Sequence, residues 1–209
     1  MTKPADVERF VSEAISEFGG VDLLVANAGV SSGAGLLDAT REDWGTTFEL
    51  NSFHAACATR AVVPSMRERG GGRVVFVASI SGRKPVHRRW QYGAAKAAVI
   101  HAARCLALEL APVKIRVNSV SPGSIMISGG QWEKYRVDDP EHFDRFIREE
   151  MPLGRLGQPG EVADAVAFLL SERGSWINGA DLGFCAAVAA IIPARPAASI
   201  NPVDALRTE

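Results

Sequence analysis

The stretch Arg73-Val-Val-Phe-Val-Ala78 is apolar at every position after the arginine and ends at Ser79. Related runs occupy residues 21–26, which end at Asn27-Ala28-Gly29, and residues 115–120, which end at Pro122-Gly123. A strand that lacks alternation of polar and apolar residues has both faces buried, as strands of parallel sheets do. The sequence therefore predicts buried parallel strands at these runs.

Stretches with apolar residues at helical spacing separate the runs. They cover roughly residues 7–18, 44–69, 92–110 and 159–171, and a short extended stretch at 179–182 follows the last of them. Repeated strand–helix–strand units with right-handed crossovers produce an open sheet with helices on both faces. We therefore predict an α/β fold, a doubly wound parallel sheet in three α/β/α layers.

Polar and glycine residues follow three of the predicted strands, at Asn27–Gly29, Ser79–Gly82 and Ser121–Gly123. In open α/β sheets the ligand crevice lies at the carboxyl ends of the strands. Each cluster by itself fits an ordinary turn, because strand ends need turn residues. Three clusters at the same edge favour a binding site.

The composition of the 209 residues is that of a globular chain, with 47% hydrophobic and 22% charged residues. The net charge of −1 argues against nucleic acid or an anionic membrane as a partner. Three distant cysteines and four histidines without metal-ligand spacing predict neither disulfides nor a metal site. No signal peptide or membrane-spanning run is visible, so we expect a cytoplasmic protein.

Tyr92 and Lys96 stand four residues apart on a predicted helix, so both side chains can enter one crevice. A nearby cation favours the phenolate and lowers the pKa of a tyrosine toward the range of a general acid–base catalyst. Ser79 ends the preceding strand and could bind a substrate oxygen, with Ser81 as a competitor for that role. Asn51 lies inside a helix, where asparagine is unfavourable, and a helix kink or a buried hydrogen bond would also explain it.

These residues belong to a larger set of motifs. They are Tyr92-x-x-x-Lys96 with Ser79 and Asn51 before it, Leu24-Val-Ala-Asn27-Ala28-Gly29, Ile115-Arg-Val-Asn118-Ser-Val-Ser-Pro122-Gly123, and Pro152-Leu-Gly-Arg155-Leu-Gly-x-Pro159. In their order along the chain, these motifs resemble those of the short-chain dehydrogenase/reductase family, most strongly its 3-oxoacyl-carrier-protein reductase-like branch. The resemblance covers about residues 3–182 and implies a Rossmann-like fold.

The resemblance implies an oxidoreductase that interconverts an alcohol and a ketone with NAD or NADP. Tyr92 would exchange a proton with the substrate oxygen, and Ser79 would position that oxygen. Lys96 would lower the pKa of Tyr92 and bind the nicotinamide ribose, and Asn51 would support a water relay. The cofactor-binding residues implied are Asn27, Ala28, Gly29, Tyr92, Lys96, Pro122, Gly123 and Ile125.

The resemblance also divides the chain. Residues 1–183 would form a partial dinucleotide-binding catalytic domain, and residues 184–209 a divergent tail rich in alanine and proline. A substrate lid would span about residues 124–155 and place Trp132, Tyr135 and Phe143 near a small-molecule substrate, although simple packing of a short helical flap would also explain these aromatics. A homodimer or homotetramer would form through the helices that carry Asn51 and Tyr92.

Three departures from the family pattern stand out. No Gly-rich strand-to-helix turn precedes the first motif, so the chain resembles a family member that lacks about 60 N-terminal residues, or two strand–helix–strand steps. Ile127 stands where a threonine is usual, so a hydroxyl contact to the cofactor is lost unless Ser128 supplies it. The usual Asp-Gly-Gly ending is absent after Leu182. We therefore expect weak dinucleotide binding and an exposed apolar edge at residues 21–26 that promotes association.

Two readings remain. One is an active NAD(P)-dependent oxidoreductase. The alternative is a catalytically impaired remnant that acts at most as a scaffold or partner-binding fragment. A methyltransferase or another nucleotide-binding α/β protein is disfavoured, because it has no use for the combined Asn, Ser, Tyr and Lys spacing.

Overall fold

The computed structural model describes residues 4–31, 33–85 and 89–184. Their centre is a parallel sheet in the order β1 (Leu23–Ala26), β2 (Gly72–Val77), β3 (Ile115–Ser121) and β4 (Asp181–Gly183). Strand neighbours in the sheet are also neighbours in the sequence, each pair joined by a helical crossover. This confirms the predicted parallel strands.

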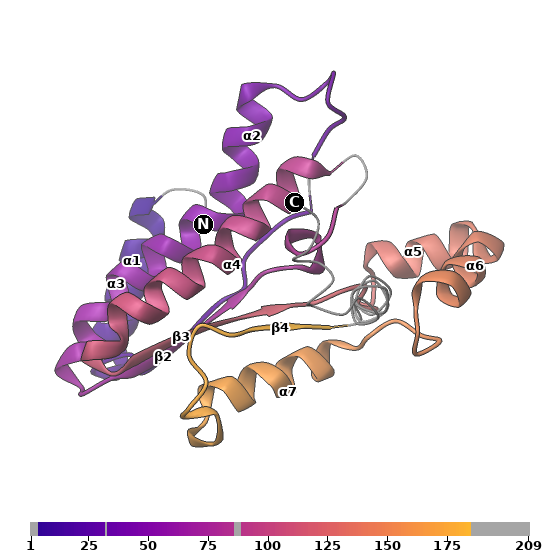
Figure 1. The fold of residues 1–209 in the computed structure, drawn as a ribbon. Coiled ribbons are helices and arrows are strands. Elements are labelled where there is room, and N and C mark those ends of the chain that lie inside the picture. Colours follow the sequence, from indigo (N-terminus) through magenta and orange to yellow (C-terminus); the bar gives the residue numbers. More distant parts are fainter. Residues whose placement is uncertain (1–3, 32, 86–88, 185–209) are drawn as a thin grey trace, which may run out of the picture.

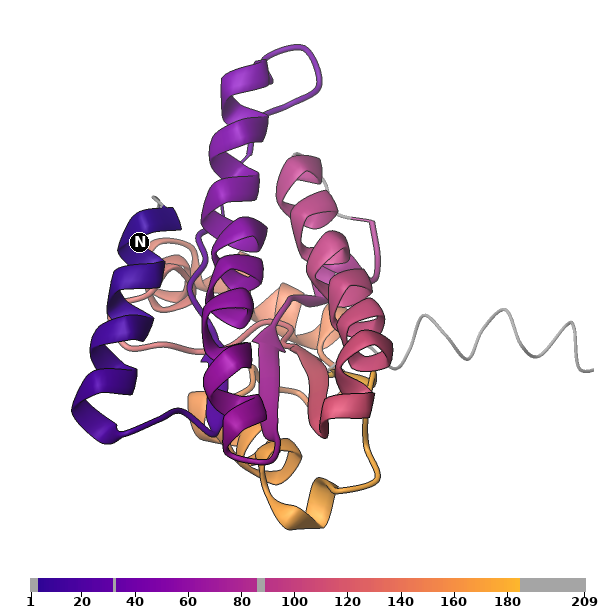
Figure 2. The same ribbon diagram turned by 90° about the vertical axis from the view of Figure 1, so that its left-hand side faces the viewer.

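Helices cover both faces of the sheet (Figures 1 and 2). On one face lie α1 (Pro4–Phe18), α3 (His54–Glu68) and α4 (Trp90–Leu110), and on the other lies α7 (Pro159–Leu170). The predicted three-layer, Rossmann-like architecture is therefore confirmed for the described residues.

The central strand β2 explains why its sequence shows no polar alternation. Val74 and Phe76 are each 1% exposed and pack with Ile115 and Val117 of β3 in the core beneath α3 and α4. Val75, also 1% exposed, belongs to a second core beneath α7. Both faces of β2 are buried, so every position after Arg73 requires an apolar side chain.

The helical stretch predicted at residues 44–69 contains a break. α2 (Arg41–Phe48) starts after Thr40, whose hydroxyl accepts a hydrogen bond from the Asp43 N–H at 3.1 Å. A π-helical turn, η1 (Glu49–Phe53), then leads directly into α3. Asn51 lies in this turn and is 1% exposed. The helix distortion that an internal asparagine suggested is therefore real.

Strand β1 lies at the edge of the described sheet. Leu23 and Val25 are 47% and 42% exposed, which is the apolar edge that the sequence predicts. Unpaired strand edges of this kind promote pairing with another chain, so the association of this chain stays a prediction.

The segment predicted as a lid forms α5 (Gln131–Asp138) and α6 (Pro140–Glu150), which lie beyond the carboxyl ends of the strands (Figure 1). It has a small core of its own, made by Phe143, Met151 and Leu156. Of the predicted C-terminal tail, Phe184 packs against the core beneath α7, and residues 185–209 lie outside the described part of the chain. No helix in the described ranges is long and apolar enough to cross a bilayer.

Candidate active site

A cavity of about 380 Å³ lies at the carboxyl ends of β1, β2 and β3. Its size is within the range of small-ligand pockets. Its lining includes every predicted catalytic and cofactor-binding residue except Ala28 and Asn51: Asn27, Gly29, Ser79, Tyr92, Lys96, Pro122, Gly123 and Ile125. The strand-end clusters that looked like separate turns in the sequence therefore meet in one place.

Ser79 and Tyr92 interact within this cavity. Ser79 precedes the short helix η2 (Ile80–Gly82), and its Oγ accepts a hydrogen bond from the Ser81 N–H at 3.2 Å. Burial raises the pKa of Tyr92 above its usual 10.0, and the neighbouring Ser79 side chain opposes part of this rise. Ser79 lines the cavity, whereas Ser81, its competitor in the sequence, is not among the lining residues.

Lys96 is buried, with 3% of its surface exposed. Its Nζ donates a hydrogen bond to the Val77 carbonyl at 2.9 Å and lies 5.8 Å from the centre of the Tyr92 ring. Burial disfavours the charged ammonium and lowers the pKa of Lys96 to about 8.

The expected lowering of the Tyr92 pKa by Lys96 is not what the structure shows. The pKa of Tyr92 is raised, and the groups that oppose this rise are Ser79 and Arg89. Lys96 is not among the groups that lower this pKa. Burial of the phenol then dominates, because it disfavours the phenolate.

Asn51 acts on the loop after β1 and does not line the cavity. Its Oδ1 accepts a hydrogen bond from the Val30 N–H at 3.1 Å, and its Nδ2 donates to the carbonyls of Val30 at 3.0 Å and Thr47 at 2.9 Å. All the polar atoms of the amide are therefore engaged. Asn51 joins the π-helical turn to the loop that carries Asn27 and Gly29.

Gly29 lies directly against the catalytic candidates. A Cβ at this position would stand 2.8 Å from Asn51 Oδ1 and 3.1 Å from Lys96 Nζ. Contacts below 3 Å force a neighbour to move, so a side chain here would displace the Asn51 amide. Glycine permits the close approach of this loop to both side chains.

We expect Gly29→Ala to lower the free energy of unfolding by about 1–3 kcal/mol, because the added methyl group overpacks a site whose neighbours are buried. Gly45→Ala in α2 is the matched control, because a Cβ there meets nothing within 4 Å. It should raise stability by up to about 1 kcal/mol through helix propensity. Urea unfolding of both variants measures the difference, and equal stability would contradict the contact described for Gly29.

An ion pair between the exposed Arg83 and the buried Asp181 holds the Ser79 segment, and sequence reasoning missed it. The Asp181 side chain, 2% exposed, lies 3.3 Å from Arg83 Nε at its Oδ2. Its Oδ1 accepts hydrogen bonds from the hydroxyls of Ser119 at 2.7 Å and Ser121 at 2.8 Å. Arg83 directly follows η2, so this network connects the segment that begins at Ser79 to the last residues of β3 and to Asp181, the first residue of β4. No local motif signals this long-range pair.

The lid contributes lining residues that the sequence identified only in part. Trp132 lines the cavity and stacks on Phe146 with ring centres 4.7 Å apart. Phe143 is 7% exposed within the lid core, and neither it nor Tyr135 lines the cavity. Ile127 is a lining residue and Ser128 is not, so Ser128 does not replace the missing threonine hydroxyl at the cavity wall.

The cavity suits the nicotinamide end of the cofactor that the resemblance implies. Gly29 supplies a backbone surface without a Cβ beside Lys96, whose ammonium is a donor for ribose hydroxyls. Pro122, Gly123 and Ile125 also line the cavity. The described residues contain no group of three His, Cys, Asp or Glu side chains that could hold a metal ion.

The family model described as enoyl-(acyl carrier protein) reductase matches residues 1–184. Dehydrogenase/reductase SDR family member 4 from Homo sapiens is 40% identical over 178 residues, which cover 85% of this chain and 63% of the human protein. The chain thus spans less than two thirds of that relative's length.

Solved structures share the fold. L-sorbose reductase from Gluconobacter frateurii, complexed with NADPH and L-sorbose, is 32% identical with a TM-score of 0.81, over 88% of this chain and 72% of that one. A 7α-hydroxysteroid dehydrogenase complexed with NADH and 7-oxo glycochenodeoxycholic acid is 30% identical with a TM-score of 0.80, over 89% and 71%. With the motifs gathered in one cavity, these similarities establish that the chain belongs to the short-chain dehydrogenase/reductase family.

Proposed function

We propose that the protein is an NAD(P)-dependent oxidoreductase that interconverts a secondary alcohol and a ketone. The observation that carries this proposal is the cavity that Ser79 and Tyr92 line beside the buried Lys96. Two neighbouring hydroxyls can bind one substrate oxygen, and one of them can exchange a proton with it.

Each residue then has a distinct role. Tyr92 donates its hydroxyl proton to the carbonyl oxygen during reduction and accepts it back during oxidation. Ser79 donates a hydrogen bond that orients the same oxygen. Lys96 binds the ribose hydroxyls and replaces the proton lost from Tyr92, and Asn51 keeps the Gly29 loop in position through Val30. The nicotinamide, when bound, supplies or accepts the hydride.

The raised pKa of Tyr92 supports this assignment in the direction of reduction. A phenol that keeps its proton at neutral pH is available as a general acid. The lowered pKa of Lys96, about 8, places a proton-exchanging group of intermediate pKa beside it. Neighbouring groups with shifted pKa values are characteristic of catalytic sites.

The substrate that we propose is a small, moderately apolar molecule. Ile125, Ile127 and Trp132 line the lid side of the cavity, whereas Ser79 and Tyr92 supply its polar end. The solved relatives hold a ketose and a 7-oxo bile acid, and both are ketones. The cofactor is NAD or NADP, since the same relatives are complexed with NADPH and NADH. A cytoplasmic homodimer or homotetramer is also part of this proposal.

Turnover by the full chain tests the proposal. Purified protein is assayed for loss of nicotinamide absorbance with NADPH or NADH and a panel containing L-sorbose, a 7-oxo bile acid and simple ketones. We expect turnover with at least one ketone. Absence of turnover with every substrate at saturating dinucleotide would favour the scaffold alternative.

A further inference from the structure

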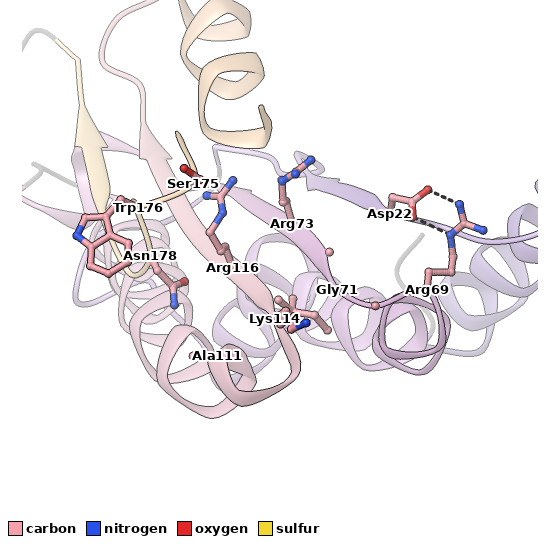
Figure 3. A pocket seen from close by; sticks show the side chains of 13 residues that line it. Asp22, Arg69, Gly71, Arg73, Ala111, Lys114, Arg116, Ser175, Trp176 and Asn178 are labelled. Atoms are coloured by element: carbon pink, nitrogen blue, oxygen red, sulfur yellow. Dashed lines mark hydrogen bonds and ion pairs between the residues drawn. The ribbon is translucent and has the colours of Figure 1, made fainter. Parts of the chain in front are cut away.

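A second cavity, of about 870 Å³, lies at the opposite edge of the sheet (Figure 3). Its lining includes Asp22, Gly72 and Lys114, which stand at or just before the first residues of β1, β2 and β3. Parallel strands place their amino ends at one edge and their carboxyl ends at the other. This cavity is therefore separated from the candidate active site by the length of the strands.

The lining of this cavity is strongly basic. It contains Arg69, Arg73, Lys114 and Arg116, with Asp22 as the acidic residue among them. Asp22 binds Arg69 through two hydrogen bonds, of 2.7 Å to Nε and 2.9 Å to Nη2, and this lowers the pKa of Asp22. The lining carboxylate is thus already neutralised by one guanidinium, and three basic side chains remain.

Two of the remaining cations are direct neighbours across strands. Arg73 of β2 and Arg116 of β3 are partners in the parallel register, so their side chains project from the same face of the sheet, as Figure 3 shows. Like charges in this arrangement repel each other. Glu172 pairs with Arg73, but 82% of its side chain is exposed, so solvent screens this pair.

Arg116 and Lys114 have no carboxylate hydrogen-bonded to them in the described ranges. Arg116 donates to the carbonyls of Leu169, Ser171 and Ile177, which fixes its guanidinium at the end of α7. Lys114 has a left-handed backbone conformation, with φ of 58°, and is exposed. The carbonyls at the end of α7 account for Arg116 and Glu172 pairs with Arg73, whereas Lys114 has no ion pair in the described ranges.

We propose that this cavity binds a multivalent phosphate anion, such as pyrophosphate or the diphosphate of a phosphate ester, between Arg73, Lys114 and Arg116. Phosphate oxygens accept several charge-assisted hydrogen bonds at once, and arginine presents donors in a matching planar fork. A bound polyanion would also remove the repulsion between the paired arginines. The rim residue Trp176, which is 98% exposed, offers a flat surface for an attached organic group.

Inorganic pyrophosphate is the probe that tests this site on the full chain. Isothermal titration calorimetry at low ionic strength should give saturable binding, which weakens as salt is added. Arg73→Gln and Lys114→Gln should each raise the Kd about fivefold, the loss of one charge-assisted contact. Arg145→Gln on α6 is the matched control and should leave the Kd unchanged.

Stability measurements separate binding from a structural role. Arg73→Gln removes a like charge beside Arg116, so its Tm without pyrophosphate should equal or exceed that of the parent chain. Pyrophosphate should raise the Tm of the parent chain and of Arg145→Gln more than that of Arg73→Gln or Lys114→Gln. Equal Kd values in all four proteins, or no saturable heat, would overturn the proposal.

Discussion

Tyr92→Phe is expected to lower kcat for ketone reduction by about 10²–10⁴-fold, the usual contribution of a general acid. The substitution removes one oxygen and leaves the ring, which packs in the cavity wall beneath Lys96. Because the proton donor is lost but the cavity keeps its shape, the apparent KM for the dinucleotide should change little. Initial rates at varied dinucleotide concentration measure both constants.

The chain provides a matched control in its other tyrosine. Tyr135 lies on α5 outside the cavity lining, so Tyr135→Phe should keep kcat within a factor of about two. Loss of rate through ionisation of Tyr92 should begin at a higher pH than an exposed tyrosine would give, because burial raises the pKa of this phenol. Equal activity of the Tyr92 and Tyr135 variants would refute the assignment of Tyr92 as the proton donor.

The strands could be predicted from the sequence because burial constrains each position directly. Val74, Val75 and Phe76 are apolar in succession since alternate side chains enter the two cores on opposite faces of β2. Their common parallel direction then follows from the helices between them. The same rule placed Asn27, Ser79 and Pro122 at one edge, and the cavity confirms that they lie together.

What the sequence could not give depends on contacts between distant segments. Asn51 was expected to support a relay from Lys96, but nothing local indicated that its amide binds both backbone polar groups of Val30. The pair of Arg83 and Asp181 joins segments that are 98 residues apart in the sequence. Such partners depend on how loops cross the end of the sheet, and no periodicity in the sequence encodes them.

Electrostatics was the least predictable part of the site. Helical spacing correctly placed Tyr92 and Lys96 in one cavity, and from this a lowered tyrosine pKa seemed to follow. The sign was wrong, because burial of the phenol raises its pKa by more than the groups that favour the phenolate lower it. Spacing determines which side chains share a face, but desolvation depends on everything packed around them.

Aromatic residues of the lid illustrate a similar limit. Trp132 and Phe143 both looked like substrate contacts in the sequence. One lines the cavity, and the other fills the core between α5, α6 and the following loop. Either position requires a large apolar side chain, so residue type alone could not separate them.

Lys96→Met is expected to raise the free energy of unfolding at neutral pH by about 1–3 kcal/mol while it abolishes turnover. Burial lowers the pKa of Lys96 from 10.5 to about 8, so the folded protein holds a charged group that would be better solvated in the unfolded chain. Methionine has a similar shape and no charge to desolvate. The loss of the hydrogen bond to the Val77 carbonyl offsets part of this gain.

The lowered pKa of Lys96 determines how the free energy of unfolding changes with pH. Below pH 8 the lysine is protonated in both states, and the full destabilisation is present. Between about 8 and 10.5 the folded protein has released the proton and the unfolded chain keeps it, so unfolding takes up a proton and the free energy of unfolding rises with pH. Above 10.5 both states are neutral at this residue and the destabilisation is gone.

Urea unfolding of the parent chain and of Lys96→Met across this pH range tests the argument. The stability advantage of the variant should be largest at neutral pH and should disappear as pH approaches 10.5. Lys134→Met, at an exposed position of α5, is the control and should show no pH-dependent difference. A Lys96→Met variant that is less stable than the parent at neutral pH would mean that Lys96 holds the loop and strand ends together, and that its contacts outweigh the cost of burying its charge. The expected result instead identifies Lys96 as a residue kept for chemistry at the expense of stability, as functional sites commonly require.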